Sequence, residues 1–183
     1  MIELKDASIR RDGRVLFKDV NLQIHPGWKI GLTGNNGTGK SSFFATLLNQ
    51  KGEGELALDT GSLSVPNGWQ IGHMAQEIES TDQSAIDFVL SGDKEYFELQ
   101  DKINHPDTLS EDELAHVHAR FDDIHGYSTP AKASQIMTGL GFNVAQESQP
   151  VSSFSGGWRM RLNLAKTLMS RADLLLLDEP TNH

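Results

Sequence analysis

The 183-residue sequence has no cysteine, which excludes disulfide bridges and thiolate metal sites and agrees with a reducing compartment. It also lacks any apolar run near the roughly 18 to 20 residues that a membrane-spanning helix requires. The first residues, "MIELKDASIRR", have no apolar stretch after their charges, so they do not form a secretory signal peptide. From these absences we expect a cytoplasmic protein without a membrane span.

Basic residues are outnumbered, with 16 Lys and Arg against 25 Asp and Glu and a formal net charge of -9. This acidic excess excludes a uniformly basic surface for nucleic acid, so we expect no DNA binding and only local contacts with RNA. The hydrophobic content of 37% fits a soluble globular domain with its own core.

Three stretches of the chain differ in residue pattern, and together they predict one domain of the α/β class. Residues 1–83 alternate short apolar runs with turn signals such as "RDGR", which predicts a group of antiparallel strands. Residues 84–150 are rich in charged helix formers, and residues 151–183 predict one more helix and a final strand. In the middle stretch, Ser110 and Glu113 have the spacing of a capping box at a helix start.

Two apolar segments predict strands at the centre of the fold. Ile30–Thr33 lies directly before a glycine-rich stretch, and four consecutive leucines form Leu174–Leu177. Such runs are typical of parallel strands that are buried on both faces of a sheet. A helix is predicted from about Gly39 to Asn49, with an apolar stripe of Phe43, Phe44, Leu47 and Leu48.

The stretch "GNNGTGKS" has the spacing Gly, four residues, Gly, Lys, Ser between the first of these strands and the helix. Its glycines let the backbone fold around phosphates, while exposed amides and the helix N-terminus attract negative charge. In this pattern Lys40 reaches the outer phosphates, and the Ser41 oxygen suits Mg²⁺. The alternative is a glycine-rich turn with a surface lysine. The predicted nucleotide-binding residues here are Gly34, Asn35, Asn36, Gly37, Thr38, Gly39, Lys40, Ser41 and Ser42.

Two carboxylates follow the leucine strand directly. A carboxylate at the C-terminal end of a parallel strand lies beside the phosphate loop. Asp178 is therefore predicted to hold Mg²⁺ through water, and Glu179 to orient and activate the attacking water as general base. Without the glycine-rich stretch, the same pair would be an ordinary solvated loop.

A third motif, "FSGGWRMRLNLAKTL", predicts a helix with an open N-terminus. Ser155 is placed to cap this helix, and Gly156 and Gly157 leave its first amides bare, which makes an anion site. The buried stripe is predicted to consist of Trp158, Leu162, Ala165 and Met169. Taken alone, the motif is more typical of an ordinary capped helix than of a ligand site.

Together these motifs resemble those of the ATP-binding cassette ATPases. The resemblance makes Gly34–Ser41 a Walker A motif, Gln76 a Q-loop glutamine, Phe154–Gly157 a signature motif and Leu174–Glu179 a Walker B motif. The motif sequences "FSGGWRMR" and "DEPTNH" are similar to those of the soluble ABC-F subfamily, and most to those of its YheS-type members. Transporter cassettes more often have Gln where this chain has Trp158.

The resemblance implies an α/β P-loop fold of cassette type, with an N-terminal antiparallel β group and a helical subdomain. It also implies an ATPase with ATP and Mg²⁺ as cofactors, whose partners are a second cassette of the same full-length chain and the ribosome or its RNA. The residues that act on the nucleotide of this cassette are then Lys40, Ser41, Gln76, Asp178 and Glu179. Those that contact the nucleotide on the partner cassette are Ser155, Gly156 and Gly157. The implied catalytic residues are Glu179, Gln76 and Lys40, and the implied metal ligands are Ser41, Gln76 and Asp178.

ABC-F proteins carry a helical arm that contacts the ribosome, and the segment from about Asp93 to His125 falls in the place of that arm. The alternative is the ordinary helical subdomain of a cassette. The segment is largely acidic, so by itself it is a poor ligand for RNA.

Cassettes of this family continue past "DEPTNH", so the resemblance implies a first cassette that is truncated after the Walker B strand. Many cassettes stack an aromatic residue on adenine, where this chain has Arg10 or Arg11, and this leaves ATP and GTP both open. Two other functions also stay open: the motor subunit of a membrane transporter, and a nucleotide-binding fragment that is inactive in isolation.

Overall fold

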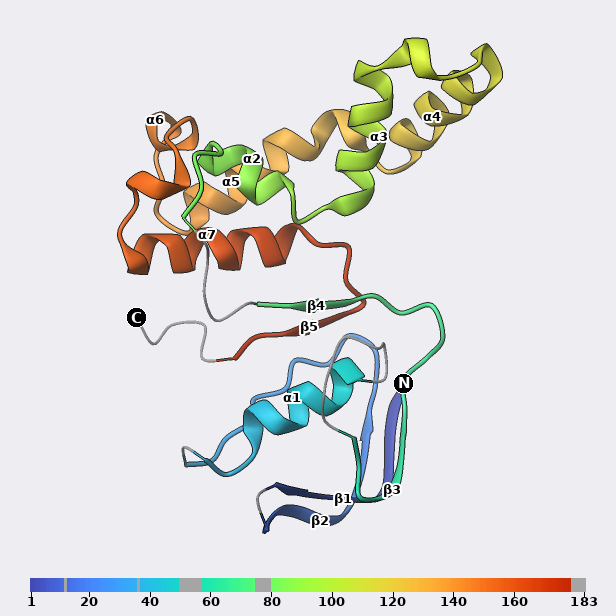
Figure 1. Ribbon diagram of the computed structural model, residues 1–183, viewed down its shortest axis with the longest axis vertical. Coiled ribbons are helices and arrows are strands. Elements are labelled where there is room, and N and C mark those ends of the chain that lie inside the picture. Colours follow the sequence, from blue (N-terminus) through green and yellow to red (C-terminus); the bar gives the residue numbers. More distant parts are fainter. Residues whose placement is uncertain (12, 36, 50–56, 75–79, 179–183) are drawn as a thin grey trace. The chain divides into compact units, whose positions relative to one another are not determined.

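The computed structural model divides into two compact units, each described here by itself (Figure 1). We name them the sheet unit, Met1–Ile71 with Ala172–Leu176, and the helical unit, Gly72–Arg171 with Leu177–His183. The structure describes residues 1–11, 13–35, 37–49, 57–74 and 80–178.

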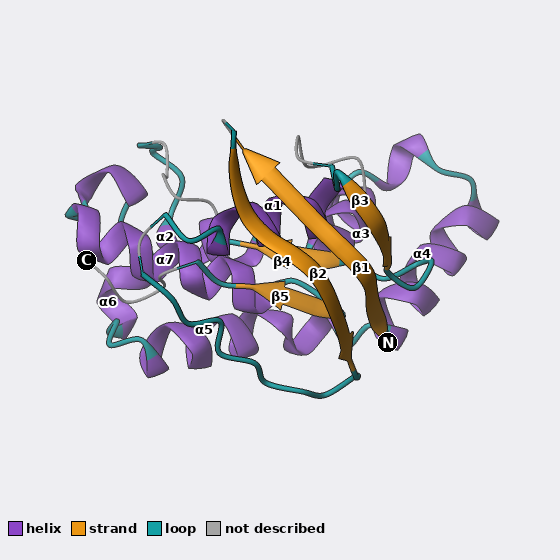
Figure 2. Ribbon diagram, turned by 90° about the horizontal axis from the view of Figure 1, so that it is seen from below, coloured by secondary structure: helices purple, strands orange, loops and turns teal. Residues whose placement is uncertain are grey.

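The sheet unit contains a three-stranded antiparallel sheet in the order β2-β1-β3 (Figure 2). Its strands are β1 (Ile2–Arg11), β2 (Arg14–Ile24) and β3 (Thr60–Ser64). β1 and β2 pair as a hairpin across the "RDGR" turn, where Gly13 has a positive φ of 77° that suits glycine. The sequence prediction of an antiparallel group in this part of the chain is therefore confirmed.

One helix, α1 (Lys40–Asn49), packs in the core of the sheet unit. Leu47 and Leu48 are buried in one cluster with apolar side chains of β1, while Phe43 and Phe44 are partly buried against it. The four residues of the predicted stripe thus all contact this core. Burial of such a stripe stabilises a helix that is too short to persist alone in water.

The prediction of a buried strand over Ile30–Thr33 is wrong. The segment forms no strand, and its apolar side chains are exposed, with Ile30 at 53% and Leu32 at 44%. A strand forms only where a neighbour accepts its backbone hydrogen bonds, and no strand in the described part of the chain pairs with this segment. An apolar composition favours burial of the segment, but a strand also requires a neighbouring strand to pair with.

A second, two-stranded sheet consists of β4 (Ile71–His73) and β5 (Leu174–Leu176). Within the sheet unit, the Gln70 backbone N–H donates to the Asp173 carboxylate at 2.9 Å, directly before both strands begin. The leucine run is therefore a strand, as predicted, but its burial on both faces is not confirmed. Leu176 is buried while Leu175 is 39% exposed, and successive side chains of a strand point to opposite faces of its sheet.

The helical unit confirms the prediction of helices after residue 84. Its helices contact one another around one core, in which α7 packs against α2 and α5. The α-helices are α2 (Ala85–Leu90), α3 (Lys94–Asn104), α4 (Glu111–Asp123), α5 (Thr129–Gly139), α6 (Val144–Glu147) and α7 (Gly156–Met169). Short 3₁₀ turns are η1 (Pro106–Thr108), η2 (Gly126–Ser128) and η3 (Val151–Ser153).

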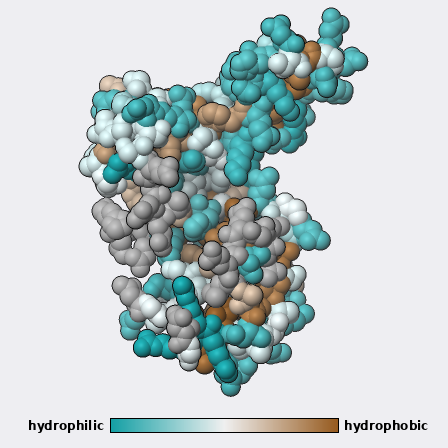
Figure 3. Space-filling model, in the orientation of Figure 1, coloured by the Kyte–Doolittle hydropathy of each residue, from teal (hydrophilic) through white to brown (hydrophobic). Residues whose placement is uncertain are grey.

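Helices α3 and α4 pack on each other as a pair, which we name the α3–α4 hairpin (Figure 1). The rings of Tyr96 and Phe121 lie 5.6 Å apart between the two helices, and Arg120 pairs with Glu95 at 2.6 Å. Hydrophilic residues cover the outer part of this hairpin in the view of Figure 3. Its exposed acidic residues include Glu98, Asp101, Asp107, Glu111 and Asp112.

The capping box at the start of α4 is confirmed. The Ser110 side chain accepts from the Glu113 backbone N–H at 3.3 Å, and the Glu113 carboxylate accepts from the Ser110 backbone N–H at 2.9 Å. This backbone hydrogen bond, together with one from the Ser110 hydroxyl, lowers the pKa of Glu113. The box therefore depends on a charged carboxylate.

We expect the stabilisation from Glu113 to be lost as pH falls. A carboxyl whose pKa is lowered in the folded state stabilises the fold above its unfolded pKa, and this contribution disappears below its folded pKa. At neutral pH the free energy of unfolding should therefore be higher for the native protein than for Glu113→Gln. In acid the two free energies should converge. Urea unfolding between about pH 3 and about pH 7 measures this. Glu111→Gln, in the same helical turn, is the control, and an equal convergence there would contradict the role of Glu113.

Candidate nucleotide-binding site

The glycine-rich loop leads directly into the N-terminus of α1, as the motif predicts. Gly37 and Gly39 have φ angles of 79° and 100°, in the region that favours glycine. A Cβ atom on Gly39 would also lie 3.0 Å from the Cβ atom of Leu16, so this position has little room for a side chain. α1 begins at Lys40, so its first backbone amides open toward the loop.

Lys40 is held at the loop by two hydrogen bonds. Its Nζ atom donates to the carbonyl oxygens of Gly34, at 2.8 Å, and Asn35, at 3.1 Å. The Thr38 hydroxyl donates to the same Asn35 carbonyl at 2.8 Å. These bonds place the positively charged amine of Lys40 among the carbonyl groups of the loop. An anion bound in the loop would therefore lie close to that charge.

The two serines after Lys40 differ in exposure. Ser41 is exposed, whereas Ser42 is buried and its carbonyl accepts a hydrogen bond from the Thr46 hydroxyl at 2.9 Å. The hydroxyl of Ser41 is therefore the one that solvent can reach beside the loop. The metal-ligand role of Ser41 and nucleotide contact by Ser42 both stay predictions.

Three predicted site residues, Asn36, Gln76 and Glu179, lie outside the described residues. Asp178 is half-buried and follows β5, as predicted for a carboxylate at the end of that strand. Among the described residues, no group of three His, Cys, Asp or Glu side chains is arranged to hold a metal.

The motif "FSGG" stands at the N-terminus of α7, with Ser155 at the predicted N-cap position. The predicted capping bond is wrong, because the Ser155 side chain makes no hydrogen bond to the first amides of the helix. Gly156 and Gly157 carry no side chains that would shield these amides, so water can satisfy them in place of the hydroxyl. Ser155 is exposed, and both its hydroxyl and the helix N-terminus are open to a ligand.

An aromatic cluster fixes the start of α7. The ring of Phe142 lies 5.7 Å from that of Phe154 and 4.8 Å from that of Trp158. The Arg161 guanidinium stacks at 4.7 Å over Trp158 and donates to the Leu140 carbonyl at 3.4 Å. Leu162, Ala165 and Met169 are buried further along the helix, which confirms the predicted stripe.

These features define a class of protein before any relative is considered. A glycine-rich loop at a helix N-terminus, with a lysine folded over it, is characteristic of P-loop nucleotide-binding domains. The described part of the chain contains no helix that is both long and apolar enough to span a membrane.

The family model described as "ABC transporter" matches residues 17–182, so the chain belongs to the ATP-binding cassette family. It is 43% identical over 184 residues to the protein of Escherichia coli strain K12 that is named "Probable ATP-binding protein YheS". It is also 36% identical over 190 residues to human ATP-binding cassette sub-family F member 3. The alignments cover 100% and 99% of this chain but 28% and 25% of those relatives. The chain thus spans about a quarter of the length of the curated relatives it matches.

A solved structure has the same fold. An ATP-binding subunit of an ABC transporter aligns with a TM-score of 0.64 and 16% sequence identity, covering 99% of this chain and 67% of that one. The identity is low, so this likeness supports the cassette fold alone. The YheS-type and subfamily F resemblance inferred from "FSGGWRMR" and "DEPTNH" is confirmed by the two relatives in that group.

Proposed function

We propose that this chain binds ATP on the glycine-rich loop and contributes half of a composite ATPase site. The observation that carries this proposal is the Lys40 side chain, whose amine lies 2.8 Å from the Gly34 carbonyl and is aimed into the loop. Phosphate oxygens would replace these carbonyl oxygens as acceptors, and the α1 amides would add further donors. The open helix start at Ser155 would serve a nucleotide on a second cassette.

Mg²⁺ fits the oxygen donors that the motif residues offer, and it would be held by Ser41, Gln76 and Asp178. When bound, it neutralises charge on the outer phosphates. Lys40 binds the outer phosphates and stabilises the charge that develops as the phosphate bond breaks. Glu179 orients the attacking water and accepts its proton.

We further propose that the intact protein couples ATP binding to the ribosome, through the α3–α4 hairpin. This is supported by the identity with sub-family F relatives and by the position of the hairpin between Gln76 and the signature helix. Its exposed acidic residues favour basic protein surfaces over RNA. Co-sedimentation with purified ribosomes, with and without ATP, tests this step separately from ATP binding.

The membrane-transporter alternative has one observation in its favour, the "ABC transporter" description of the matching family model. It predicts co-purification with a membrane partner, whereas the proposed function predicts recovery with ribosomes. Titration with ATP and GTP in parallel decides which base is preferred.

Glu179→Gln is expected to keep ATP affinity within about threefold and to reduce single-turnover hydrolysis by at least about 100-fold. The amide conserves shape but cannot accept a proton from water, so ATP should remain trapped between the cassettes. Filter binding and quenched-flow hydrolysis in the intact protein measure the two effects. Glu98→Gln, at an exposed position on α3, is the control. Unchanged turnover in Glu179→Gln would remove this residue from the proposed role.

A further inference from the structure

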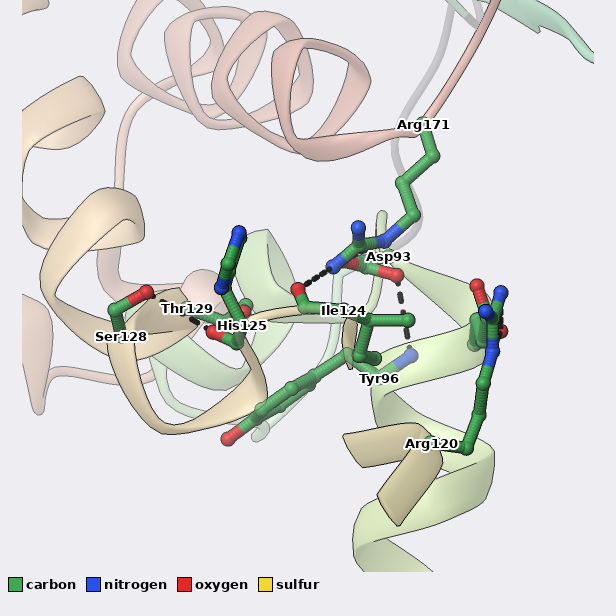
Figure 4. A network of polar contacts seen from close by, with 9 residues as sticks. Asp93, Tyr96, Arg120, Ile124, His125, Ser128, Thr129 and Arg171 are labelled. Carbon is green, nitrogen blue, oxygen red and sulfur yellow. Dashed lines mark hydrogen bonds and ion pairs between the residues drawn. The ribbon is translucent and has the colours of Figure 1, made fainter. Parts of the chain in front are cut away.

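The base of the α3–α4 hairpin contains a buried carboxylate, Asp93, that makes two different bonds (Figure 4). One oxygen caps α3 by accepting from the Tyr96 backbone N–H at 3.1 Å. The other oxygen accepts from Nε of Arg171 at 2.8 Å. Asp93 is only 3% exposed, and each of its two carboxylate oxygens accepts a hydrogen bond.

Arg171 also contacts the other end of the hairpin. Its Nη2 atom donates to the carbonyl oxygen of Ile124, the C-cap residue of α4, at 2.8 Å. A single guanidinium therefore joins the first residue of the hairpin to its last. Two different nitrogens of one planar guanidinium, Nε and Nη2, bond the two acceptors in a fixed relative geometry, and the single nitrogen of a lysine side chain does not reproduce it.

The root of the hairpin is also seated on α7 by close backbone packing. A Cβ atom on Gly92 would lie 1.9 Å from the Lys166 carbonyl oxygen, so no side chain fits between the two segments. The Lys166 amine lies 4.5 Å from the centre of the Phe88 ring, and burial lowers the pKa of this lysine. The hairpin root and the C-terminal half of α7 thus form one tightly packed body.

Arg171 occupies a special place along the chain. α7 ends at Met169, and β5 begins at Leu174. Arg171 is the last residue of the helical unit before the chain enters the sheet unit, which contains β5. Arg171 therefore lies on the direct chain connection between α7 and β5.

We propose that Arg171 is a positioning residue that couples the α3–α4 hairpin to the signature helix α7 and, through the chain, to the strand that precedes Asp178 and Glu179. This proposal rests on the proposed ATPase and ribosome function and deepens it. A partner that displaces the hairpin would move both bonded ends of Arg171 and so shift the start of the Walker B strand. Packed bodies of this kind move as units and do not deform gradually.

Two variants separate charge from geometry. Asp93→Asn keeps a good capping residue for α3 but removes the negative charge that pairs with Arg171. Arg171→Lys keeps the positive charge but replaces the two separate donor nitrogens, Nε and Nη2, with one nitrogen on a flexible stem. Arg120→Ala is the matched control, because its ion pair with Glu95 lies wholly within the hairpin.

In the intact protein, both test variants should retain basal ATPase and ribosome affinity within about twofold, because the loop and the hairpin surface are unchanged. The stimulation of ATPase by ribosomes should fall by at least about fivefold, the lower range of typical coupling between sites. Arg120→Ala should be stimulated like the native protein. Native-like stimulation in Asp93→Asn and Arg171→Lys would overturn the proposal.

Hydrogen exchange separates failure of this proposal from failure of the ribosome function. In the native protein, ATP with Mg²⁺ should change the exchange of backbone amides in α3 and α4, even without ribosomes. This change should be lost in Arg171→Lys and Asp93→Asn but kept in Arg120→Ala. If ribosomes neither bind nor stimulate the native protein, this pattern would still support Arg171 as the coupling residue. No change in the native protein, or the same change in the test variants, would overturn it.

Discussion

Replacing Lys40 with alanine is expected to weaken ATP binding by about 30- to 1000-fold, which corresponds to about 2 to 4 kcal/mol. The amine is held at the loop by the Gly34 and Asn35 carbonyl groups, where an incoming phosphate would meet it. Its loss removes a charge-assisted bond to the outer phosphates and leaves the α1 amides as the main donors. Hydrolysis should fall further, because the same charge stabilises the transition state.

Titration with a fluorescent ATP analogue and single-turnover hydrolysis measure these two losses. Lys18→Ala is the control, since that lysine is exposed and pairs only at 3.7 Å with Asp19. The folded state should change little in Lys40→Ala, because the two lost bonds are local to the loop. ATP affinity within threefold of the native value would contradict nucleotide binding at this loop.

Replacing Gly92 with alanine is expected to destabilise the helical unit by about 2 to 4 kcal/mol. The added Cβ atom would lie 1.9 Å from the carbonyl oxygen of Lys166 and 2.8 Å from its carbonyl carbon. Both are backbone atoms of α7, so the collision cannot be relieved by turning a side chain. α7 must shift or the turn before α3 must open, and either change loosens the Asp93 bond to Arg171.

Urea unfolding followed by circular dichroism measures this destabilisation. Gly139→Ala provides a matched control, because a Cβ atom there meets nothing within 4 Å and the residue lies at the end of α5. This control should be neutral or more stable by up to about 1 kcal/mol, since alanine restricts the unfolded chain. Equal stability of the two variants would show that the turn at Gly92 accommodates a Cβ atom without loss of stability, which would contradict the prediction.

Local patterns in the sequence predicted the elements whose hydrogen bonds are local. The start of α4 and its capping box follow from the spacing of Ser110 and Glu113. The glycine-rich loop and α1 likewise appear where the motif placed them. A helix bonds within its own segment, so a short window of residues contains most of the required information.

The failed predictions concern features that need a distant partner. Ile30–Thr33 has strand composition but no strand pairs with it among the described residues, and Leu175 is exposed beside a buried neighbour. Strand pairing and two-sided burial depend on segments far along the chain. At Ser155 the position of the cap was right, but the rotation of one hydroxyl is not encoded in the motif.

The network around Arg171 had no signal in the sequence. Its ion pair joins residues 78 positions apart, and its bond to Ile124 spans 47 positions. The residue order alone thus establishes the cassette family, the glycine-rich loop and the helices, because motif spacing and periodicity are local properties. Folding in three dimensions alone establishes that Gly92 lies against α7 and that one arginine joins both ends of the hairpin, because long-range contacts arise only when the helices pack.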